Sequence, residues 1–145
     1  MRSKGAYGVG RFSVQFEIAN HVDVIDEQRG LLEPGKVRRM MVRGVVDSGA
    51  TKLVLPGKIA RQLGLPRLGK GKVRYANIQT ATRETVADAH VRLLGRDGVF
   101  SAIVEPRRQS VLIGAIVLED LDFIVDCTQQ RLVPRDPRYI ISEIE

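Results

Sequence analysis

The stretch Val45-Val46-Asp47-Ser48-Gly49-Ala50-Thr51, followed by the apolar run Leu53-Val54-Leu55, is the most informative part of this chain. It places an acidic side chain where an apolar strand runs into a tight turn. A carboxylate near an apolar core is costly unless it is hydrogen-bonded or shares a proton, and such carboxylates are frequent at functional sites. The bare tripeptide Asp47-Ser48-Gly49 also fits a β-turn whose acid accepts backbone N–H bonds. The flanking apolar runs favour a strand–loop–strand unit centred on Asp47.

The composition is that of an ordinary globular protein with an aliphatic core. Of the 145 residues, 43% are hydrophobic, 28% are charged and only 5% are aromatic, which favours strands rich in Val, Leu and Ile. This length predicts one domain over residues 1–145. We expect its core at about residues 10–135, with the N-terminus and residues 136–145 at the periphery.

Several features predict a cytoplasmic protein that is not bound to a membrane. The longest apolar stretch, at 111–118, is too short to span a bilayer, and the basic start at 1–5 lacks the apolar segment of a signal peptide. The single cysteine, Cys127, excludes an internal disulfide. The net charge of +6 is compatible with nucleic acid as a partner. However, the Lys and Arg residues are scattered and not interleaved with aromatics, so we do not expect such binding.

Alternation and turn residues predict a series of short strands in the first half of the chain. Residues 11–18 alternate between apolar and polar side chains, as in a half-buried strand, and Val22 and Val24 suggest that it continues after a break at Asn20. The turn Glu33-Pro34-Gly35 then leads into a return strand over 36–46. A short helix is expected over 56–64, closed by a glycine.

The second half of the chain reads in the same way. The later elements are expected in this order: strands over 72–75 and 85–94 around a polar stretch, a tight turn at Asp97-Gly98, strands over 99–104 and 111–113, a short helix over 115–121, and strands over 123–125 and 131–133. Many short strands with frequent turns predict an all-β domain, either a closed barrel or a sandwich.

The order of these pieces resembles the retropepsin-like aspartic proteases, the single-domain relatives of pepsin, and more narrowly their small bacterial members. In that family an N-terminal hairpin leads to Asp-Thr/Ser-Gly-Ala-Thr, then a short helix, a flap hairpin, and a hydrophobic-hydrophobic-Gly segment with a helix. The matching parts here are Asp47-Ser48-Gly49-Ala50-Thr51, Leu63-Gly64-Leu65, residues 73–86, Leu112-Ile113-Gly114 and residues 115–121. The resemblance covers about residues 10–135 and implies a closed acid-protease barrel with one or two short helices.

The resemblance also implies a function, that of an aspartic endopeptidase. In such enzymes two carboxylates share one proton and hold the water that attacks the peptide bond. This chain carries Asp-Ser-Gly once, so the second carboxylate has to come from another subunit, and a symmetric homodimer with one Asp47 from each subunit is the consistent arrangement. The resemblance further implies that Ser48 braces the paired loops and that the Gly49 N–H serves the carboxylate. It implies a peptide or protein substrate, no cofactor and no metal.

The expected flap departs from the pattern of the family. Family members often have Ala-Asp/Asn-Gly at this place, whereas this chain has Ala76-Asn77-Ile78. Ile78 either packs apolar surface over a bound peptide or belongs to a strand after a different turn. These three residues are the candidate substrate-binding residues of the flap.

The remaining polar residues carry weaker signals. His21 and His90 lie far apart with no metal-ligand spacing, so we expect surface or hydrogen-bonded histidines. Asp126 follows an apolar strand without a Ser-Gly, and the acids Glu119, Asp120 and Asp122 are expected to be solvated near a helix. Two other function classes stay open: a protease-like dimerisation or peptide-binding module without useful catalysis, and a nucleic-acid-binding β-domain that rests on charge alone.

Overall fold

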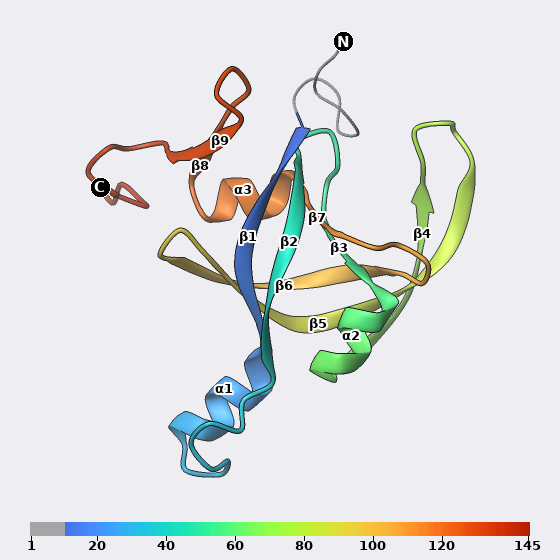
Figure 1. Ribbon diagram of the computed structural model, residues 1–145, viewed down its shortest axis with the longest axis vertical. Helices are drawn as coiled ribbons and strands as arrows, with labels where there is room; N and C mark the ends of the chain where they lie inside the picture. The colour runs from blue at the N-terminus through green and yellow to red at the C-terminus, as the bar shows by residue number, and fades with distance from the viewer. Residues whose placement is uncertain (1–10) are drawn as a thin grey trace.

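The computed structural model describes residues 11–145. It contains nine strands and three short helices joined by turns and loops (Figure 1). The strands are β1 (Arg11–Asn20), β2 (Arg39–Asp47), β3 (Leu53–Pro56), β4 (Arg67–Arg74), β5 (Thr80–Leu93), β6 (Arg96–Glu105), β7 (Val111–Ile113), β8 (Phe123–Asp126) and β9 (Arg131–Pro134). The helices are α1 (His21–Gln28), α2 (Gly57–Leu63) and α3 (Ala115–Asp120). The all-β class predicted from the sequence is confirmed.

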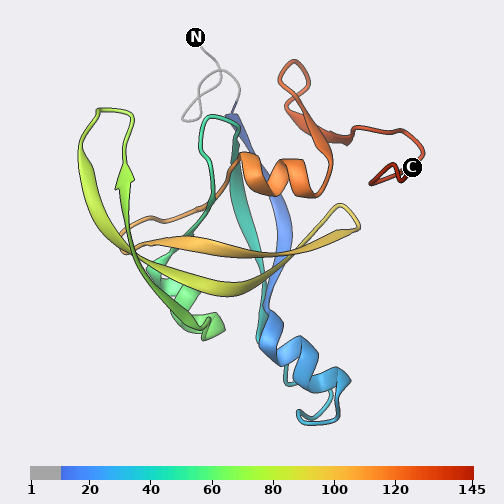
Figure 2. The ribbon, with the colours of Figure 1, turned by 180° about the vertical axis from the view of Figure 1, so that it is seen from behind.

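Six of the strands close into a barrel. They follow the order β1-β2-β7-β3-β6-β5, and β5 pairs back onto β1, for example at Ile18↔Val91. Closure leaves these strands without a free edge. The strand β4 pairs only with β5, and β8 and β9 form a separate hairpin near the C-terminus (Figures 1 and 2). The barrel alternative is therefore correct, and the sandwich alternative is not adopted.

Aliphatic side chains and phenylalanines fill the interior of the barrel. The alternation over residues 11–18 turns Phe12, Phe16 and Ile18 inward, and each is at most 4% exposed. Burying a side chain of this size contributes about 1.5–3 kcal/mol to folding. The barrel strands β2, β3, β5 and β7 add fully buried residues to this core, namely Val46, Leu53, Leu55, Val91, Leu93, Val111 and Ile113.

A close approach of three strands fixes the end of the barrel where β2 stops. A Cβ atom on Gly44 would lie 2.7 Å from Phe16 Cε1 and 2.9 Å from Ile113 Cδ1, so only glycine leaves room for both side chains. The strand β7 then runs parallel to β2, with Val46 opposite Ile113. Because parallel strands end at the same edge of a sheet, Asp47 at the end of β2 and Gly114 just after β7 lie at the same end of the barrel.

The predicted continuation of the first strand through Val22 and Val24 is wrong, because the chain enters α1 there. Asn20 caps this helix: its side-chain oxygen accepts a hydrogen bond from the Asp23 N–H at 3.1 Å, and its amide nitrogen donates to the Leu63 carbonyl at 2.8 Å. An N-cap asparagine satisfies a free N–H of the first helical turn. The cap and its long-range bond decide the conformation, although the apolar spacing of residues 22–24 is compatible with a strand.

The hairpin between β5 and β6 turns at Leu94-Gly95 and not at Asp97-Gly98 as predicted. Leu94 and Gly95 both have positive φ angles, of 50° and 82°, which is the conformation of the primed turns that suit twisted hairpins. Asp97 lies within β6, opposite Arg92. This register buries Leu93 completely, so core packing overrides the more favourable turn chemistry of Asp-Gly.

The helix α1 is joined to the start of β2 by a buried carboxylate. Asp23 is 7% exposed, and its Oδ2 accepts hydrogen bonds from the Arg38 backbone N–H at 3.0 Å and from Arg38 Nε at 2.8 Å. Its Oδ1 accepts a third bond from Arg38 Nη2 at 3.0 Å. These bonds hold the pKa of Asp23 below its ordinary value despite the opposing effect of burial.

We expect Asp23→Asn to lower the free energy of unfolding at pH 7 by about 1.5–3 kcal/mol, because hydrogen bonds to an ionised group are lost. A carboxyl group with a depressed folded-state pKa stabilises the fold above its unfolded-state pKa and loses this effect as the pH falls through the folded-state value. The difference between wild type and variant should therefore shrink below about pH 4. Urea unfolding at several pH values measures it, and a difference that persists at pH 2 would contradict the assignment.

Candidate active site

Asp47 lies where β2 ends, and the backbone of its own loop holds the carboxylate. Asp47 Oδ1 accepts the Gly49 N–H at 3.0 Å, and the Asp47 carbonyl accepts the Ala50 N–H at 3.1 Å. Ser48, Gly49 and Thr51 are exposed, Ala50 is half-buried, and the Asp47 side chain is 21% exposed. The Gly49 N–H thus serves the carboxylate of its own loop, as in a β-turn closed by its acid, and the loop presents an ionisable group at the surface of the single chain.

Arg11 lies beside the other oxygen of this carboxylate. Its Nε is 3.8 Å from Asp47 Oδ2, and the two residues face each other in the register of β1 and β2. The Arg11 side chain is 51% exposed, so the ion pair is a weak contact screened by solvent. No motif in the sequence marks Arg11, although the antiparallel pairing of β1 with β2 places it opposite Asp47.

The segment Leu112-Ile113-Gly114 packs against the Asp47 loop. The backbone N–H groups of Ala115 and Ile116, at the start of α3, donate to the carbonyls of Ala50 and Thr51 at 2.8 and 2.9 Å. A Cβ atom on Gly114 would collide with the carbonyl of Lys52 and lie 2.8 Å from its nitrogen. The structure thus brings together the two predicted elements that stand far apart in the sequence, and glycine is required where they meet.

The predicted flap is the hairpin of β4 and β5, which extends away from the barrel (Figures 1 and 2). Both strands are longer than expected, because the added residues, 67–71 and 80–84, are mostly polar residues and glycines on an exposed ribbon and do not alternate between apolar and polar side chains. The Ile78 N–H donates to the Tyr75 carbonyl and the Tyr75 N–H to the Gln79 carbonyl, each at 2.9 Å. Ala76 and Asn77 lie in the turn and are exposed.

Ile78 is in this turn, so the alternative in which it belongs to a strand is not adopted. It is 76% exposed and has a φ of 73°. The hydrogen bonds define a short loop that ends in a left-handed residue, a position usually taken by glycine. A β-branched residue pays about 1–2 kcal/mol for this conformation. Because isoleucine stands where the family often has glycine, the backbone at the tip of the hairpin is strained.

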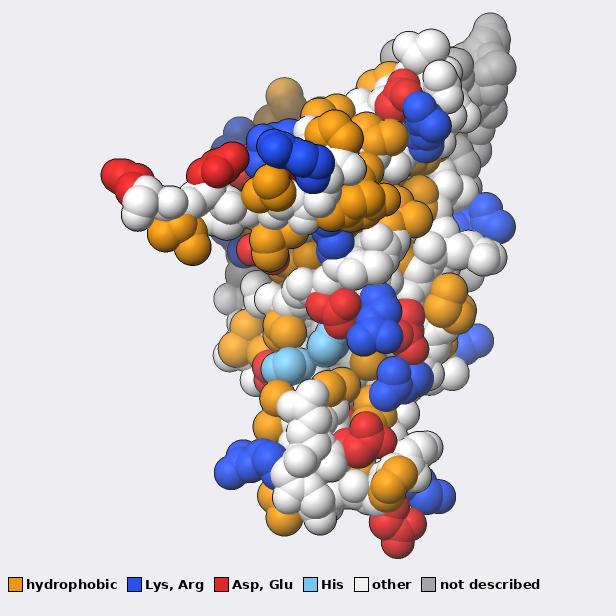
Figure 3. Space-filling view, turned by 90° about the vertical axis from the view of Figure 1, so that its left-hand side faces the viewer, with side chains coloured by type: hydrophobic (Ala, Val, Ile, Leu, Met, Phe, Trp, Pro, Cys, Tyr) orange, Lys and Arg blue, Asp and Glu red, His pale blue; other side chains and the backbone are white. Residues whose placement is uncertain are grey.

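His21 and His90 form a pair that the sequence analysis did not detect. Their Nδ1 atoms lie 3.1 Å apart, and His90 Nε2 lies 2.7 Å from Asp97 Oδ2. The two rings are adjacent in the space-filling view of Figure 3. The prediction of a hydrogen-bonded histidine at position 90 is confirmed. Within residues 11–145, no group of three or more His, Cys, Asp or Glu side chains is arranged to hold a metal.

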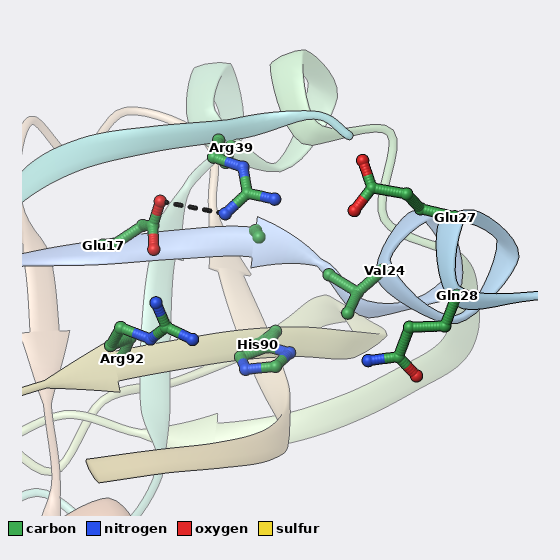
Figure 4. Close-up of a pocket in the computed structure, with 8 residues that line it drawn as sticks. Glu17, Val24, Glu27, Gln28, Arg39, His90 and Arg92 are labelled. Carbon is green, nitrogen blue, oxygen red and sulfur yellow. Dashed lines mark hydrogen bonds and ion pairs between the residues drawn. The ribbon is translucent and has the colours of Figure 1, made fainter. Parts of the chain in front are cut away.

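Two cavities lie away from the Asp47 loop. One, of about 200 Å³, separates α1 from the barrel; it is shown in Figure 4, where Glu17 pairs with Arg39 at 3.3 Å. The other, of about 380 Å³, lies between α2 and strands β4 to β6. Asp47 lines neither of them. The charged lining of the first, which also includes Glu27, His90 and Arg92, is largely occupied by contacts within the chain.

The other acidic candidates have structural explanations. Asp126 Oδ1 accepts the Gln129 N–H in the β8–β9 turn at 3.1 Å; this bond, with Arg131 nearby, lowers the pKa of Asp126. Glu119 and Asp120 are exposed, as predicted. Asp122 is not a solvated acid: Arg135 Nε donates to its Oδ1 at 2.7 Å, and its Oδ2 is buried without a partner among the described residues.

The sequence of this chain matches the profile of one protein family. The profile of a family described as "gag-polyprotein putative aspartyl protease" matches residues 34–120. The match spans more than half of the chain and includes the Asp47 loop, the β4–β5 hairpin and Gly114. The chain belongs to this family. It is a retropepsin-like aspartyl protease by family, as the order of its motifs indicated.

Solved structures of retroviral proteases are distantly similar to this aspartyl protease family member. EIAV protease complexed with the inhibitor HBY-793 is 18% identical, with a TM-score of 0.48 over 56% of this chain and 77% of that one. A foamy viral protease–reverse transcriptase in complex with an RNA/DNA hybrid is 15% identical, with a TM-score of 0.46 over 72% of this chain and 11% of that one. Simian foamy virus (mac) protease is 13% identical, with a TM-score of 0.43 over 54% and 80%. A search of curated proteins found no match.

No helix in the described residues is long and apolar enough to cross a membrane.

We expect Ile78→Asn to raise the free energy of unfolding by about 1 kcal/mol, because asparagine tolerates the left-handed conformation that isoleucine resists. Ile78→Val is the matched control, since valine is also β-branched and should leave the stability unchanged. Urea unfolding of the three proteins measures the difference. Equal stability of the asparagine and valine variants would show that the turn carries no strain at this residue.

Proposed function

We propose that this protein is an aspartic endopeptidase that works as a homodimer, with one Asp47 from each subunit at the two-fold axis. The observation that carries the proposal is the single Asp47 loop, held at one end of a closed barrel by Gly114 and α3. Membership of the aspartyl protease family supports the chemistry. The peptide would lie between the paired Asp47 loops and the hairpins that carry Ala76, Asn77 and Ile78.

The proposed reaction needs two carboxyl groups in opposite protonation states. Two carboxylates at hydrogen-bond distance do not both ionise readily, so the pair retains one proton. The ionised member takes a proton from water as the water oxygen bonds to the peptide carbonyl carbon. The protonated member donates its proton to the carbonyl oxygen. As the tetrahedral intermediate collapses, the C–N bond breaks and the leaving nitrogen takes the proton that the first carboxylate had received from water. The second carboxylate takes a proton back from a hydroxyl of the intermediate, which leaves a carboxylic acid product and restores the single shared proton.

The exposure of the Asp47 loop supports association of two copies. Ser48, Gly49 and Thr51 are exposed in the single chain, which leaves their polar groups available to a second loop. We propose that Ser48 donates a hydrogen bond across the axis and braces the pair. A cytoplasmic location, with peptides or proteins as substrates, is part of the same proposal.

A second candidate function is a dimeric peptide-binding module without useful catalysis. Two observations favour it: the strained Ile78 at the tip of the hairpin and the Arg11 guanidinium beside the Asp47 carboxylate. An arginine that remained there in the dimer would favour two ionised carboxylates over a shared proton. Peptide binding without cleavage from acidic to neutral pH would identify this function.

We expect Asp47→Asn to abolish peptide cleavage, because an amide neither accepts the proton of the water nor donates one as an acid. Cleavage of unstructured protein substrates by the purified variant measures this. Asp126→Asn is the control, since Asp126 is an acid at a strand end that binds its own turn, and it should leave cleavage unchanged. Cleavage by Asp47→Asn at the wild-type rate would refute the proposal.

A mixing experiment tests the shared site directly. If each active site needs two Asp47 residues, adding an equal amount of Asp47→Asn protein to a fixed amount of wild type should lower total activity to about half once subunits exchange. The mixture holds twice as many dimers as the wild-type sample. Under random exchange one quarter of them have two wild-type subunits, which is half of the original number of active dimers. Unchanged activity after complete exchange would show that each chain acts alone.

We expect a bell-shaped dependence of kcat/KM on pH between about pH 4 and pH 8, because one carboxyl group must be protonated and the other ionised. The two limbs belong to the coupled pair and not to one subunit. Initial rates over this range measure the profile. A flat profile would contradict a dyad that shares a proton.

A further inference from the structure

The β4–β5 hairpin leaves the barrel as a two-stranded ribbon. Pairing between β5 and β6 begins at Thr85↔Ile103, so residues 80–84 of β5 pair only with β4. A two-stranded ribbon alone is marginally stable in water. Figures 1 and 2 show this ribbon extending from the barrel, so its position relative to the barrel depends on contacts made by its side chains.

One carboxylate receives both polar contacts from the ribbon. Tyr75 Oη donates to Glu105 Oε2 at 2.5 Å, and Arg83 Nε donates to Glu105 Oε1 at 2.8 Å. The guanidinium carbon of Arg83 also lies 6.0 Å from the centre of the Tyr75 ring. Among the described residues, no other side-chain hydrogen bond or ion pair joins residues 70–83 to the barrel.

Glu105 is well placed to act as this anchor. Its side chain is only 18% exposed, and its backbone pairs with Pro56 at the end of β3. The hydrogen bond to Glu105, together with burial, raises the pKa of Tyr75 above its ordinary value. Both oxygens of the carboxylate are thus occupied by charge-assisted hydrogen bonds, which are stronger than neutral ones.

The anchor connects the ribbon to the strands that hold Asp47. Residues 106–110 lead from Glu105 into β7, and β7 lies between β2, which ends at Asp47, and β3. Through Glu105 the hairpin is therefore tied to strands next to the Asp47 loop, since Glu105 also pairs with Pro56 at the end of β3. Asp47 itself is held by other contacts, those of Gly49 and of the start of α3.

We propose that Glu105 is the positioning residue of the flap: it holds the ribbon at a fixed position relative to the Asp47 loop before a peptide binds. This inference rests on the proposed function for its effect on catalysis. Because the anchor orders the ribbon in the free protein, peptide binding loses less conformational entropy. Without it, peptide affinity falls, whereas the reacting groups at Asp47 keep their geometry.

The test compares Glu105→Ala and Tyr75→Phe with a control in the same ribbon, Arg67→Gln. Arg67 pairs with Glu84 at 3.3 Å, both side chains are more than half exposed, and neither touches Glu105. We expect Glu105→Ala to raise KM about tenfold with kcat within about twofold. Tyr75→Phe removes one of the two bonds and should raise KM about threefold. The control should match wild type.

Hydrogen exchange gives a readout that does not depend on cleavage. The amides of Tyr75 and Ile78 are hydrogen-bonded within the turn, and loss of the anchor should speed their exchange about tenfold while the barrel strands stay protected. Tyr75→Phe serves as the test if Glu105→Ala does not fold. Wild-type exchange in the folded variants would overturn the proposal, as would a fall in kcat at unchanged KM. If wild type cleaves nothing, the proposed function fails, and exchange alone decides on the anchor.

Discussion

The parallel pairing of β2 with β7 is the constraint on which the site of this protein depends. It requires Gly44, because Phe16 and Ile113 fill the space above that residue. It brings Gly114 so close to Lys52 that no side chain fits there. The two strands then end together, and the first N–H groups of α3 hold the carbonyls of Ala50 and Thr51. A loop fixed at both ends in this way keeps the Asp47 carboxylate at one place.

The fixed position of the Asp47 loop also bears on the function that we propose. The Asp47 loop is held by the Gly49 N–H and by the start of α3, and among residues 11–145 the Asp47 carboxylate has one further contact, the weak ion pair with Arg11. The fold supplies one carboxylate of defined position, and the chemistry of peptide hydrolysis requires two. Subunit association and catalysis are therefore linked in the function that we propose.

The hairpin of β4 and β5 differs from this rigid end in its physical basis. In its outer part, residues 70–83, the backbone ladder joins only β4 and β5, and among the described residues the side-chain polar contacts of this part with the barrel converge on Glu105. Its tip accommodates Ile78 in a conformation that suits glycine. A ribbon with few anchors is expected among the least stable parts of a fold, where binding loops are also found. The division of the molecule into a fixed Asp47 loop and a less tethered hairpin follows from the distribution of these contacts.

Local patterns were sufficient for much of the fold. The alternation over residues 11–18, the closing Gly64 and the apolar run before Gly114 predicted elements that the structure contains, because burial and helix termination act over a few residues. The predictions failed where distant contacts decide the conformation. Asn20 starts a helix and binds the Leu63 carbonyl, and the hairpin register follows the burial of Leu93 and not the Asp97-Gly98 turn signal.

By itself, the sequence determined the all-β class, the position of Asp47 at a strand end and the presence of a single acidic motif, since each is a property of neighbouring residues. Only the tertiary structure decided the contact of Gly114 with the Asp47 loop, the Arg11–Asp47 pair and the meeting of Tyr75 and Arg83 at Glu105. The partners in these contacts lie far apart in the sequence. Closure of the barrel brings them together, and the distance in space between two residues cannot be read from their separation along the chain.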